Sequence, residues 1–274
     1  MMKSIAFGQF YPANSPLHKL DPRMKVILTI LYIVCSFLCK NLLSFALLAI
    51  SAIVLILFGR VPIRIVLRGL RPVLIILAFT AILNIFWTKG EQLLFSWRFI
   101  QIYAEGLYSA VFMMVRIATL IIGTGMFLTY TTTPIALTDA LEDLLSPLKK
   151  LKVPVHEFAM MMTIALRFIP LLSEETEKIM TAQKARGADF SSGGLIQRAK
   201  ALIPILIPLF VSAFNRAGDL ATAMECRCYH GGEGRTRMHV RHIRFVDFIP
   251  LILVILLGAS LIFLNILGFG FSLK

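Results

Sequence analysis

Five long apolar runs, separated by polar stretches, dominate the pattern of residues along this chain. They lie at about residues 24–39, 43–58, 72–87, 106–130 and 248–269. A helix needs roughly 20 apolar residues to cross the hydrocarbon core of a bilayer. The first run is short, so Lys25 and Lys40 at its ends would have to extend toward the interface. The pattern predicts an all-α membrane protein with about five transmembrane helices.

The stretch between residues 131 and 245 has helical periodicity but a mixed composition. A helix is expected from Pro134 to Leu148, with Thr133 as its N-cap. Two longer helices follow, at residues 154–186 and 195–228. Each begins apolar, contains proline, becomes amphipathic and ends at an arginine with small neighbours. Their apolar runs are too short and too interrupted to be assigned as membrane spans.

Positive charge is distributed unevenly among the segments between the runs. Fifteen Lys and Arg residues lie between Thr131 and Val246, and the N-terminal arm and the loop after the second run are also basic. The tip at Lys40 and the stretch 88–105 carry few positive charges. Because positively charged loops remain in the cytoplasm, the N-terminus and residues 131–245 are expected inside and the C-terminus outside.

These patterns predict three domains. Residues 1–130 form an N-terminal membrane domain with four spans, residues 131–245 a cytoplasmic helical domain, and residues 246–274 a C-terminal transmembrane helix.

Composition agrees with a multi-pass protein of the cell membrane. The chain has 274 residues, of which 58% are hydrophobic and only 16% charged, and its mean hydropathy is +0.81. Soluble domains carry about a quarter charged residues. The net charge of +13 is accounted for by the orientation signal and by contact with anionic lipid, which excludes nucleic acid as a partner. Four arginines share one helical face and predict a short helix in the interface plane: Arg60, Arg64, Arg68 and Arg71.

The chain lacks the common nucleotide-binding and catalytic motifs. It has no Gly-x-x-x-x-Gly-Lys-Ser/Thr loop to bind nucleotide phosphates, and no His-Glu-x-x-His or Gly-x-Ser-x-Gly. Cys226, Cys228 and His230 could form a metal site, although their spacing fits no standard zinc pattern. Arg116 lies within a span, where it is either a functional group or packs against a polar partner. We therefore expect a protein that is not an enzyme and holds no metal.

Two arginine-centred triplets are the strongest candidates for a binding role. Ala185-Arg186-Gly187 and Cys226-Arg227-Cys228 end the two long helices. Small neighbours let a partner surface approach closely, and a guanidinium offers several directed donors. The alternative is that Arg186 and Arg227 only complement the helix dipoles.

The chain resembles the transmembrane coupling (T) subunit of energy-coupling factor (ECF) transporters, which are ABC-type importers. The resemblance rests on the sequences GQFYP at 8–12 and SPLHKLDPRMK at 15–25, and on AQKARGA at 182–188. The triplet Ala185-Arg186-Gly187 matches the family's Ala-Arg-Gly motif. The second triplet departs from it, because Cys226 and Cys228 stand where Ala and Gly are usual.

The resemblance implies an L-shaped arrangement in which the two long helices are coupling helices. Each triplet would dock into one of two ATP-binding subunits, which would hold the ATP and Mg, and no cofactor would bind this chain. ATP hydrolysis would topple a substrate-binding membrane subunit, possibly one of several exchangeable ones, during uptake of a vitamin or other micronutrient. The apolar faces of the two helices would contact that subunit through Phe158, Met161, Met162, Ala165, Phe168, Ile169, Ile203, Leu206 and Phe210.

Two other classes of protein stay open. A stand-alone secondary transporter or channel would carry substrate itself, but paired halves are absent and few charges lie within the spans. A membrane-embedded enzyme would need acids, histidines or a nucleophile near the membrane face, and His156 with Glu157 is the nearest candidate.

Overall fold

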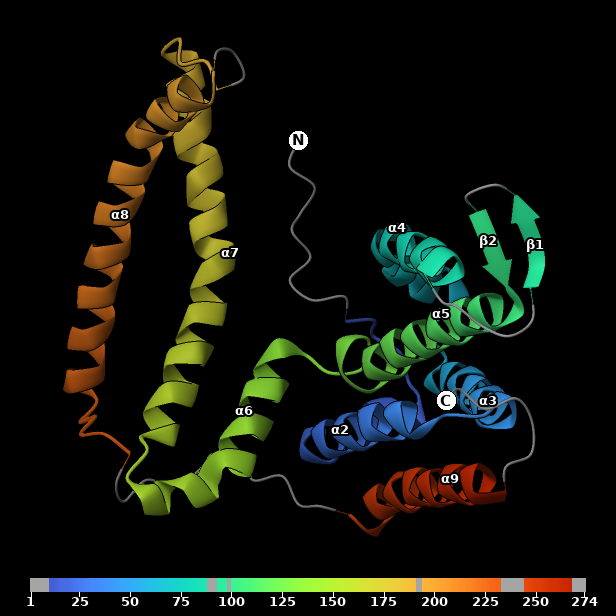
Figure 1. Cartoon of the computed structure of the whole chain (residues 1–274). Coiled ribbons are helices and arrows are strands. Elements are labelled where there is room, and N and C mark those ends of the chain that lie inside the picture. The colour runs from blue at the N-terminus through green and yellow to red at the C-terminus, as the bar shows by residue number, and fades with distance from the viewer. Residues whose placement is uncertain (1–9, 88–92, 98–99, 191–193, 233–243, 268–274) are drawn as a thin grey trace. The chain divides into compact units, whose positions relative to one another are not determined.

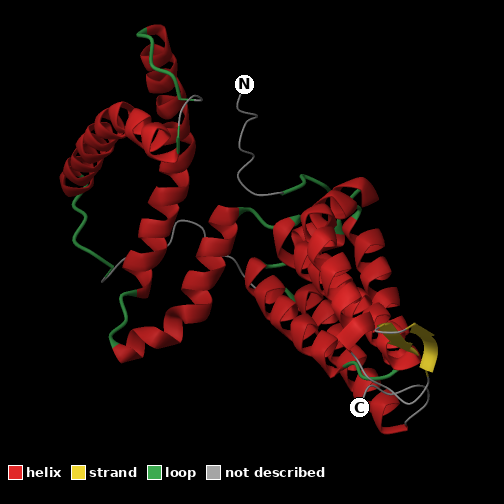
Figure 2. Cartoon of the chain, turned by 45° about the horizontal axis from the view of Figure 1, so that its top comes forward, coloured by secondary structure: helices red, strands yellow, loops and turns green. Residues whose placement is uncertain are grey.

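The computed structural model describes residues 10–87, 93–97, 100–190, 194–232 and 244–267. Helices make up most of this part of the chain (Figures 1 and 2), which confirms the prediction of an all-α membrane protein. The chain divides into two compact units. Unit 1 comprises Met1–Ala140 and Val240–Lys274, and unit 2 comprises Leu141–His239.

Unit 1 contains a helix at each of the five apolar runs. These are α2 (Pro22–Leu38), α3 (Leu42–Gly59), α4 (Ile63–Trp87), α5 (Ala104–Thr124) and α9 (Phe248–Leu267). Shorter helical elements accompany them: α1 (Pro16–Lys19), the π-helix η1 (Gly125–Thr129) and the 3-10 helix η3 (Phe245–Asp247). Helix α2 packs against α5 and α9, and α5 also packs against α3 and α4. Figure 1 shows these helices gathered around α5 and α2.

Two differences from the sequence prediction lie around α4. The expected interface helix at Arg60–Arg71 is wrong as a separate element, because α4 runs without a break from Ile63 through Pro72 to Trp87. Membrane helices tolerate proline where neighbouring groups satisfy the freed backbone. A β-hairpin that the pattern did not predict follows, with β1 (Leu93–Trp97) antiparallel to β2 (Ile100–Tyr103).

Aromatic side chains and one glycine organise the core of unit 1. Tyr32 packs edge-on against Phe127, with ring centroids 5.9 Å apart, and Phe45 stacks on Phe112 at 4.8 Å. Gly123 of α5 faces the Tyr32 ring so closely that a Cβ atom there would overlap the ring. A glycine is therefore required where α2 and α5 meet.

The structure also corrects the expectation that Lys25 extends toward the interface. Its side chain does not extend outward, because Lys25 is 1% exposed and its Nζ donates a hydrogen bond of 2.8 Å to the backbone oxygen of Thr131. Lys40, at the other end of the run, is exposed as expected.

Unit 2 contains the two longest helices, α7 (Val155–Ala185) and α8 (Leu195–Cys226). The chain reaches them through α6 (Pro134–Leu145) and the 3-10 helix η2 (Ser146–Leu151). Thr133 caps α6 as predicted, because its Oγ1 accepts a hydrogen bond of 3.3 Å from the N–H of Ala136. Helices α7 and α8 pack against each other.

In the described part of the chain, six helical segments are long and apolar enough to cross a membrane. They are Leu42–Gly59, Ile63–Trp87, Ala104–Thr129, Val155–Ala185, Ile196–Cys226 and Phe245–Leu267. The segments in α7 and α8 are the least apolar of the six and the least buried. Helix α2, with 17 residues, is not among these six. The cytoplasmic assignment of α7 and α8 stays a prediction from the charge pattern.

Candidate docking site

The first arginine triplet forms a regular helix C-cap. Arg186 is the C-cap residue of α7, and Gly187 follows with a φ of +88°. The N–H of Gly187 donates to the oxygen of Lys184 (3.0 Å), and the N–H of Ala188 donates to the oxygen of Gln183 (3.0 Å). This pair of bonds is the Schellman motif, which requires a left-handed residue directly after the cap and favours glycine there.

The second triplet folds into the same motif at the end of α8. Arg227 is the C-cap residue, and Cys228 takes the left-handed position with a φ of +58°. The N–H of Cys228 donates to the oxygen of Glu225 (2.9 Å), and the N–H of Tyr229 donates to the oxygen of Met224 (3.1 Å). The two triplets therefore present an arginine at the same position of the same turn, although their sequences differ on both sides of it.

Both triplets are open to a partner. Their six residues are all exposed: Ala185, Arg186, Gly187, Cys226, Arg227 and Cys228. Helices α7 and α8 run in opposite directions, so the two caps lie at opposite ends of the helix pair (Figure 1). Helix α7 has 31 residues and is therefore about 46 Å long. The two arginines are suited to two separate contacts rather than to one shared site.

Large apolar side chains are exposed along both helices. Phe158 and Met161 of α7 are more than half exposed, as are Leu206 and Phe210 of α8. The other side chains of the predicted contact face are exposed or, in Phe168, partly exposed: Met162, Ala165, Phe168, Ile169 and Ile203. Exposed apolar surface of this extent marks an interaction site with a protein or with lipid.

A polar cluster joins the two helices beyond these faces. Nη2 of Arg216 in α8 lies 2.9 Å from Oε2 of Glu175 in α7, and the Ser212 hydroxyl donates to Oε1 of Glu175 at 2.6 Å. The carboxylate thus accepts from two groups one helical turn apart on α8. This pairing was not visible in the sequence pattern, because the partners lie 37 and 41 residues apart.

Arg116 belongs to a second polar cluster, at the end of α2. Its Nη2 donates to the backbone oxygen of Cys39 (2.8 Å), and its guanidinium lies over the Phe45 ring, 5.1 Å from the centroid. Asn265 of α9 donates to the oxygen of Leu38 (2.6 Å), and Asn41 donates to the oxygen of Leu264 (3.2 Å). These bonds satisfy carbonyl groups at the ends of α2 and α9. The structure therefore supports the packing interpretation of Arg116.

Among the residues that the structure describes, no three His, Cys, Asp or Glu side chains are placed to hold a metal ion together. This includes Cys226, Cys228 and His230. Cys226 and Cys228 are exposed, and Cys35 and Cys39 are buried in unit 1. His156, the candidate for an enzyme, pairs with Glu142 at 3.0 Å and lies beside Gly232.

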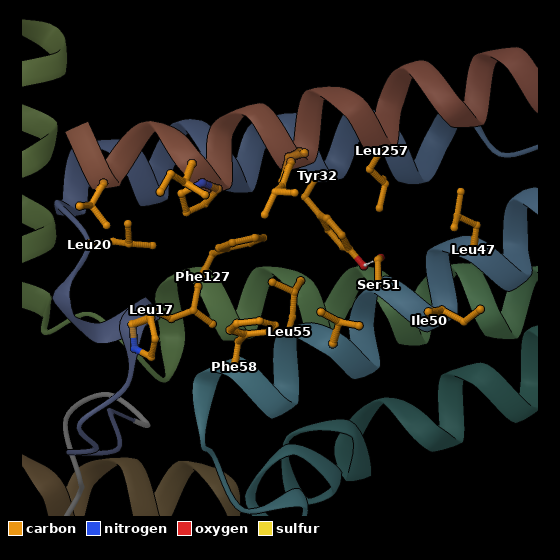
Figure 3. A pocket seen from close by; sticks show the side chains of 17 residues that line it. Leu17, Leu20, Tyr32, Leu47, Ile50, Ser51, Leu55, Phe58, Phe127 and Leu257 are labelled. Carbon is orange, nitrogen blue, oxygen red and sulfur yellow. Dashed lines mark hydrogen bonds between the residues drawn. The ribbon is translucent and has the colours of Figure 1, made fainter. Parts of the chain in front are cut away.

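A cavity of about 510 Å³ lies among the helices of unit 1. Figure 3 shows its lining, in which the Tyr32 hydroxyl reaches Ser51 at 3.1 Å among apolar side chains of α2, α3 and α9. The Ser51 hydroxyl donates to the backbone oxygen of Leu48 (2.6 Å), so the Tyr32 hydroxyl is the donor to Ser51. The remaining surface suits a hydrocarbon group rather than a charged or strongly polar solute.

Comparison with known proteins places the chain in one group throughout its length. Residues 13–240 match the CbiQ family model, described as cobalt transport protein. Several relatives carry the name energy-coupling factor transporter transmembrane protein EcfT, among them the three that follow. The chain is 52% identical over 265 residues to that of Ruminiclostridium cellulolyticum, covering 97% of this chain and 96% of the relative. It is 52% identical over 250 residues to that of Clostridium kluyveri (91% and 92%) and 47% identical over 265 residues to that of Bacillus subtilis (97% and 100%).

Proposed function

The chain belongs to the CbiQ family and, within it, to the transmembrane subunits of energy-coupling factor transporters, and from this membership we propose that it couples ATP hydrolysis by two partner ATPases to uptake through a separate membrane subunit. The chain itself is a multi-pass membrane component of a transporter. The ATP and Mg would be held by the partners, and the substrate by the separate subunit.

One observation carries the proposal: two unequal sequences form the same arginine-bearing cap. A role limited to the helix dipole needs only a positive charge somewhere in the last turn. It does not require the arginine to occupy the C-cap position in both helices, or the following residue to be left-handed. Cys228 adopts this conformation at a cost of about 1 kcal/mol relative to glycine. A partner that recognises the turn with its arginine explains why both helices end in the same way.

The position of the caps supports two ATPases rather than one. The caps lie at opposite ends of the α7–α8 pair (Figure 1), so each can reach a different partner. Arg186 and Arg227 are exposed, and each guanidinium presents several donors in a fixed plane. In our proposal each arginine enters a groove on one ATPase, and the small neighbouring residues allow the groove walls to close around the turn.

The apolar faces of α7 and α8 would hold the substrate-binding subunit. Phe158, Met161 and Met162 offer a wide surface on α7, and Leu206 and Phe210 do so on α8. Methionine side chains adapt to partners of different shape, which suits exchangeable substrate subunits for vitamins or other micronutrients. Movement of the two helices during the ATPase cycle would then topple the bound subunit. The N-terminus and α6–α8 would face the cytoplasm, and the C-terminus would lie outside.

The stand-alone transporter is the weaker alternative. The cavity in unit 1 is lined by apolar side chains apart from one pair of hydroxyl groups, and it offers no charged group to a polar substrate. Flux of substrate through liposomes that contain this chain alone would favour that alternative.

The test is affinity purification of the chain from its native membrane, comparing wild type with Arg186→Glu plus Arg227→Glu. We expect wild type to bring down one or two ATPases and at least one small membrane protein, and the double variant to lose the ATPases but keep the membrane protein. Arg198→Glu plus Lys200→Glu is the matched control, because it makes the same change of charge at exposed positions of α8.

Three outcomes separate the possibilities. Retention of the ATPases by the arginine variant would refute docking through the caps. Their loss from both variants would show a general effect of charge. A wild-type chain that is purified without any ATPase would refute coupling itself.

A further inference from the structure

The N-terminal segment Tyr11–Lys25 contacts both stretches of chain through which unit 1 is connected to unit 2. Residues 130–133 belong to unit 1 and lead into α6, within which the chain passes to unit 2 after Ala140. After it returns to unit 1 at Val240, its first described residues are 244–247. All the contacts below lie within unit 1. We call Tyr11–Lys25 the N-terminal clasp.

Two hydrogen bonds fix the outgoing stretch to the clasp. The N–H of Tyr11 donates to the oxygen of Tyr130 (3.0 Å), and Nζ of Lys25 donates to the oxygen of Thr131 (2.8 Å). These oxygens lie directly beyond the π-helix η1, whose last turn is closed by a bond from the N–H of Tyr130 to the oxygen of Gly125 (2.9 Å). The π-helical turn is a rare geometry that occurs often at functional positions. The π-helix ends at Thr129, directly before Tyr130, whose backbone oxygen accepts the hydrogen bond from Tyr11.

Lys25 makes this attachment unusually firm. Its side chain is 1% exposed, and its ammonium group also donates to the oxygen of His18 (3.4 Å). A buried charge is costly unless hydrogen bonds compensate it. The ammonium therefore cannot leave the Thr131 carbonyl without a large penalty, and the outgoing stretch is held to the base of α2.

The His18 ring gives the clasp its internal shape. Its Nε2 donates to the oxygen of Tyr11 (2.8 Å), and its Nδ1 lies 2.7 Å from the Ser15 hydroxyl and accepts from it when the ring is neutral. Because the ring links Tyr11 to Ser15, the N–H of Tyr11 is presented to Tyr130. Lys25 therefore binds the outgoing stretch directly at Thr131, and His18 supports its second contact, between Tyr11 and Tyr130.

The returning stretch is attached through Asp247. One carboxylate oxygen accepts a hydrogen bond of 2.8 Å from the N–H of Arg244, and the other accepts a longer one of 3.4 Å from the N–H of Asp21. Asp247 is 5% exposed. The clasp thus holds unit 1 on the stretch that leads into α6 and again on the stretch that leads into α9.

We propose that Lys25 is a positioning residue for energy coupling. By fixing the exit into α6 to the membrane unit, it makes movement of the coupling helices act on that unit instead of being lost in a slack connection. This inference rests on the proposed function, and its structural part can be tested without it.

The structural part is tested by hydrogen–deuterium exchange of the full chain, comparing Lys25→Met with Lys19→Met. Methionine keeps the length of the apolar stem but removes the donors. Lys19 is the matched control, because it lies in the same segment and is exposed. We expect peptides with Tyr11 and with Tyr130–Thr132 to exchange at least tenfold faster in Lys25→Met, with α9 unchanged and Lys19→Met like wild type. Wild-type exchange in Lys25→Met would overturn the clasp.

The coupling part is tested in liposomes that contain the complete transporter. We expect Lys25→Met to keep its ATPases and their ATP hydrolysis, while uptake per ATP hydrolysed falls at least fivefold. Lys19→Met should match wild type. Unchanged uptake per ATP would overturn the positioning role, and so would loss of the ATPases together with uptake, since that marks a structural defect alone.

A second variant covers the case in which Lys25→Met does not fold. His18→Ala removes the link between Tyr11 and Ser15 but leaves the buried ammonium in place, and we expect the same changes in smaller degree. If wild type itself binds no ATPase, the proposed function and the coupling role fail together. The exchange experiment still decides whether the clasp exists.

Discussion

At the residue scale, left-handed residues other than glycine mark the ends of helical segments. In the described part of the chain they are Arg60, Lys152 and Cys228. Arg60 ends α3 and Lys152 ends η2, while Cys228 follows the cap of α8. This conformation costs a residue with a side chain about 1 kcal/mol or more. The cost is therefore accepted where a helix must stop at a defined residue.

The two caps give paired predictions for stability. Cys228→Gly should raise the free energy of unfolding by about 1 kcal/mol, because glycine adopts the left-handed conformation freely. Gly187→Ala should lower it by a similar amount through backbone strain alone, because the space around Gly187 is open. Thermal unfolding of the full chain in detergent measures both. Equal shifts of the same sign would contradict the shared geometry.

Arg116 shows how a charged residue within a span serves packing. Helix α2 has 17 residues and is about 25 Å long, which is shorter than the roughly 30 Å of the hydrocarbon core. Its last carbonyl groups therefore need partners inside the protein. Arg116 and Asn265 supply them at Cys39 and Leu38.

We expect Arg116→Met to destabilise the chain by about 2 kcal/mol, because it leaves the Cys39 carbonyl unpaired. The midpoint of thermal unfolding in detergent should fall by roughly 5 °C. Arg68→Met is the control, since Arg68 is exposed on α4 and should change the midpoint little. A small effect of Arg116→Met would instead point to a role in function.

At the level of elements, a polar contact joins the two amphipathic helices α7 and α8. Arg216 and Ser212 lie one turn apart on α8, and both reach Glu175 on α7. Apolar surfaces can slide against each other, whereas this contact has one geometry. It therefore fixes the register of the two helices.

A double-mutant cycle tests this contact. With Glu175→Gln and Arg216→Met, alone and combined, we expect a small favourable coupling energy, as for other solvent-exposed ion pairs. Unfolding in denaturant measures it. High salt should reduce the value, and strictly additive effects would show that the pair does not fix the register.

For the molecule as a whole, the native cysteines can report on docking, so no cysteine has to be introduced. Cys226 and Cys228 are exposed beside Arg227, while Cys35 and Cys39 are buried in unit 1. Two thiols should thus react quickly with a maleimide and two slowly. If the α8 cap enters a groove on an ATPase, that partner should shield the reactive pair.

We expect purified ATPase subunits to slow the labelling of Cys226 and Cys228 at least tenfold in the detergent-solubilised complex. Arg227→Glu should keep labelling fast in the presence of the ATPases, because the cap no longer docks. Mass spectrometry of the labelled peptides gives the rates. Fast labelling of wild type in a complex that contains the ATPases would place the contact elsewhere.

The apolar helices and the two arginine triplets can be recognised without the structure. Apolar runs report membrane helices because the bilayer imposes their length and composition. Local rules also placed the Thr133 cap and the end of α7 at Gly187, since each depends on neighbouring residues.

Contacts between residues far apart in the chain, in contrast, become visible only in the fold. Lys25 looks like an interfacial lysine in the sequence, and its bond to Thr131, 106 residues away, depends on the packing of α2 against η1. The same holds for Glu175 with Arg216 and for Arg116 with Cys39. Whether a charge is buried depends on the groups that surround it in three dimensions, and periodicity along the chain does not encode those groups.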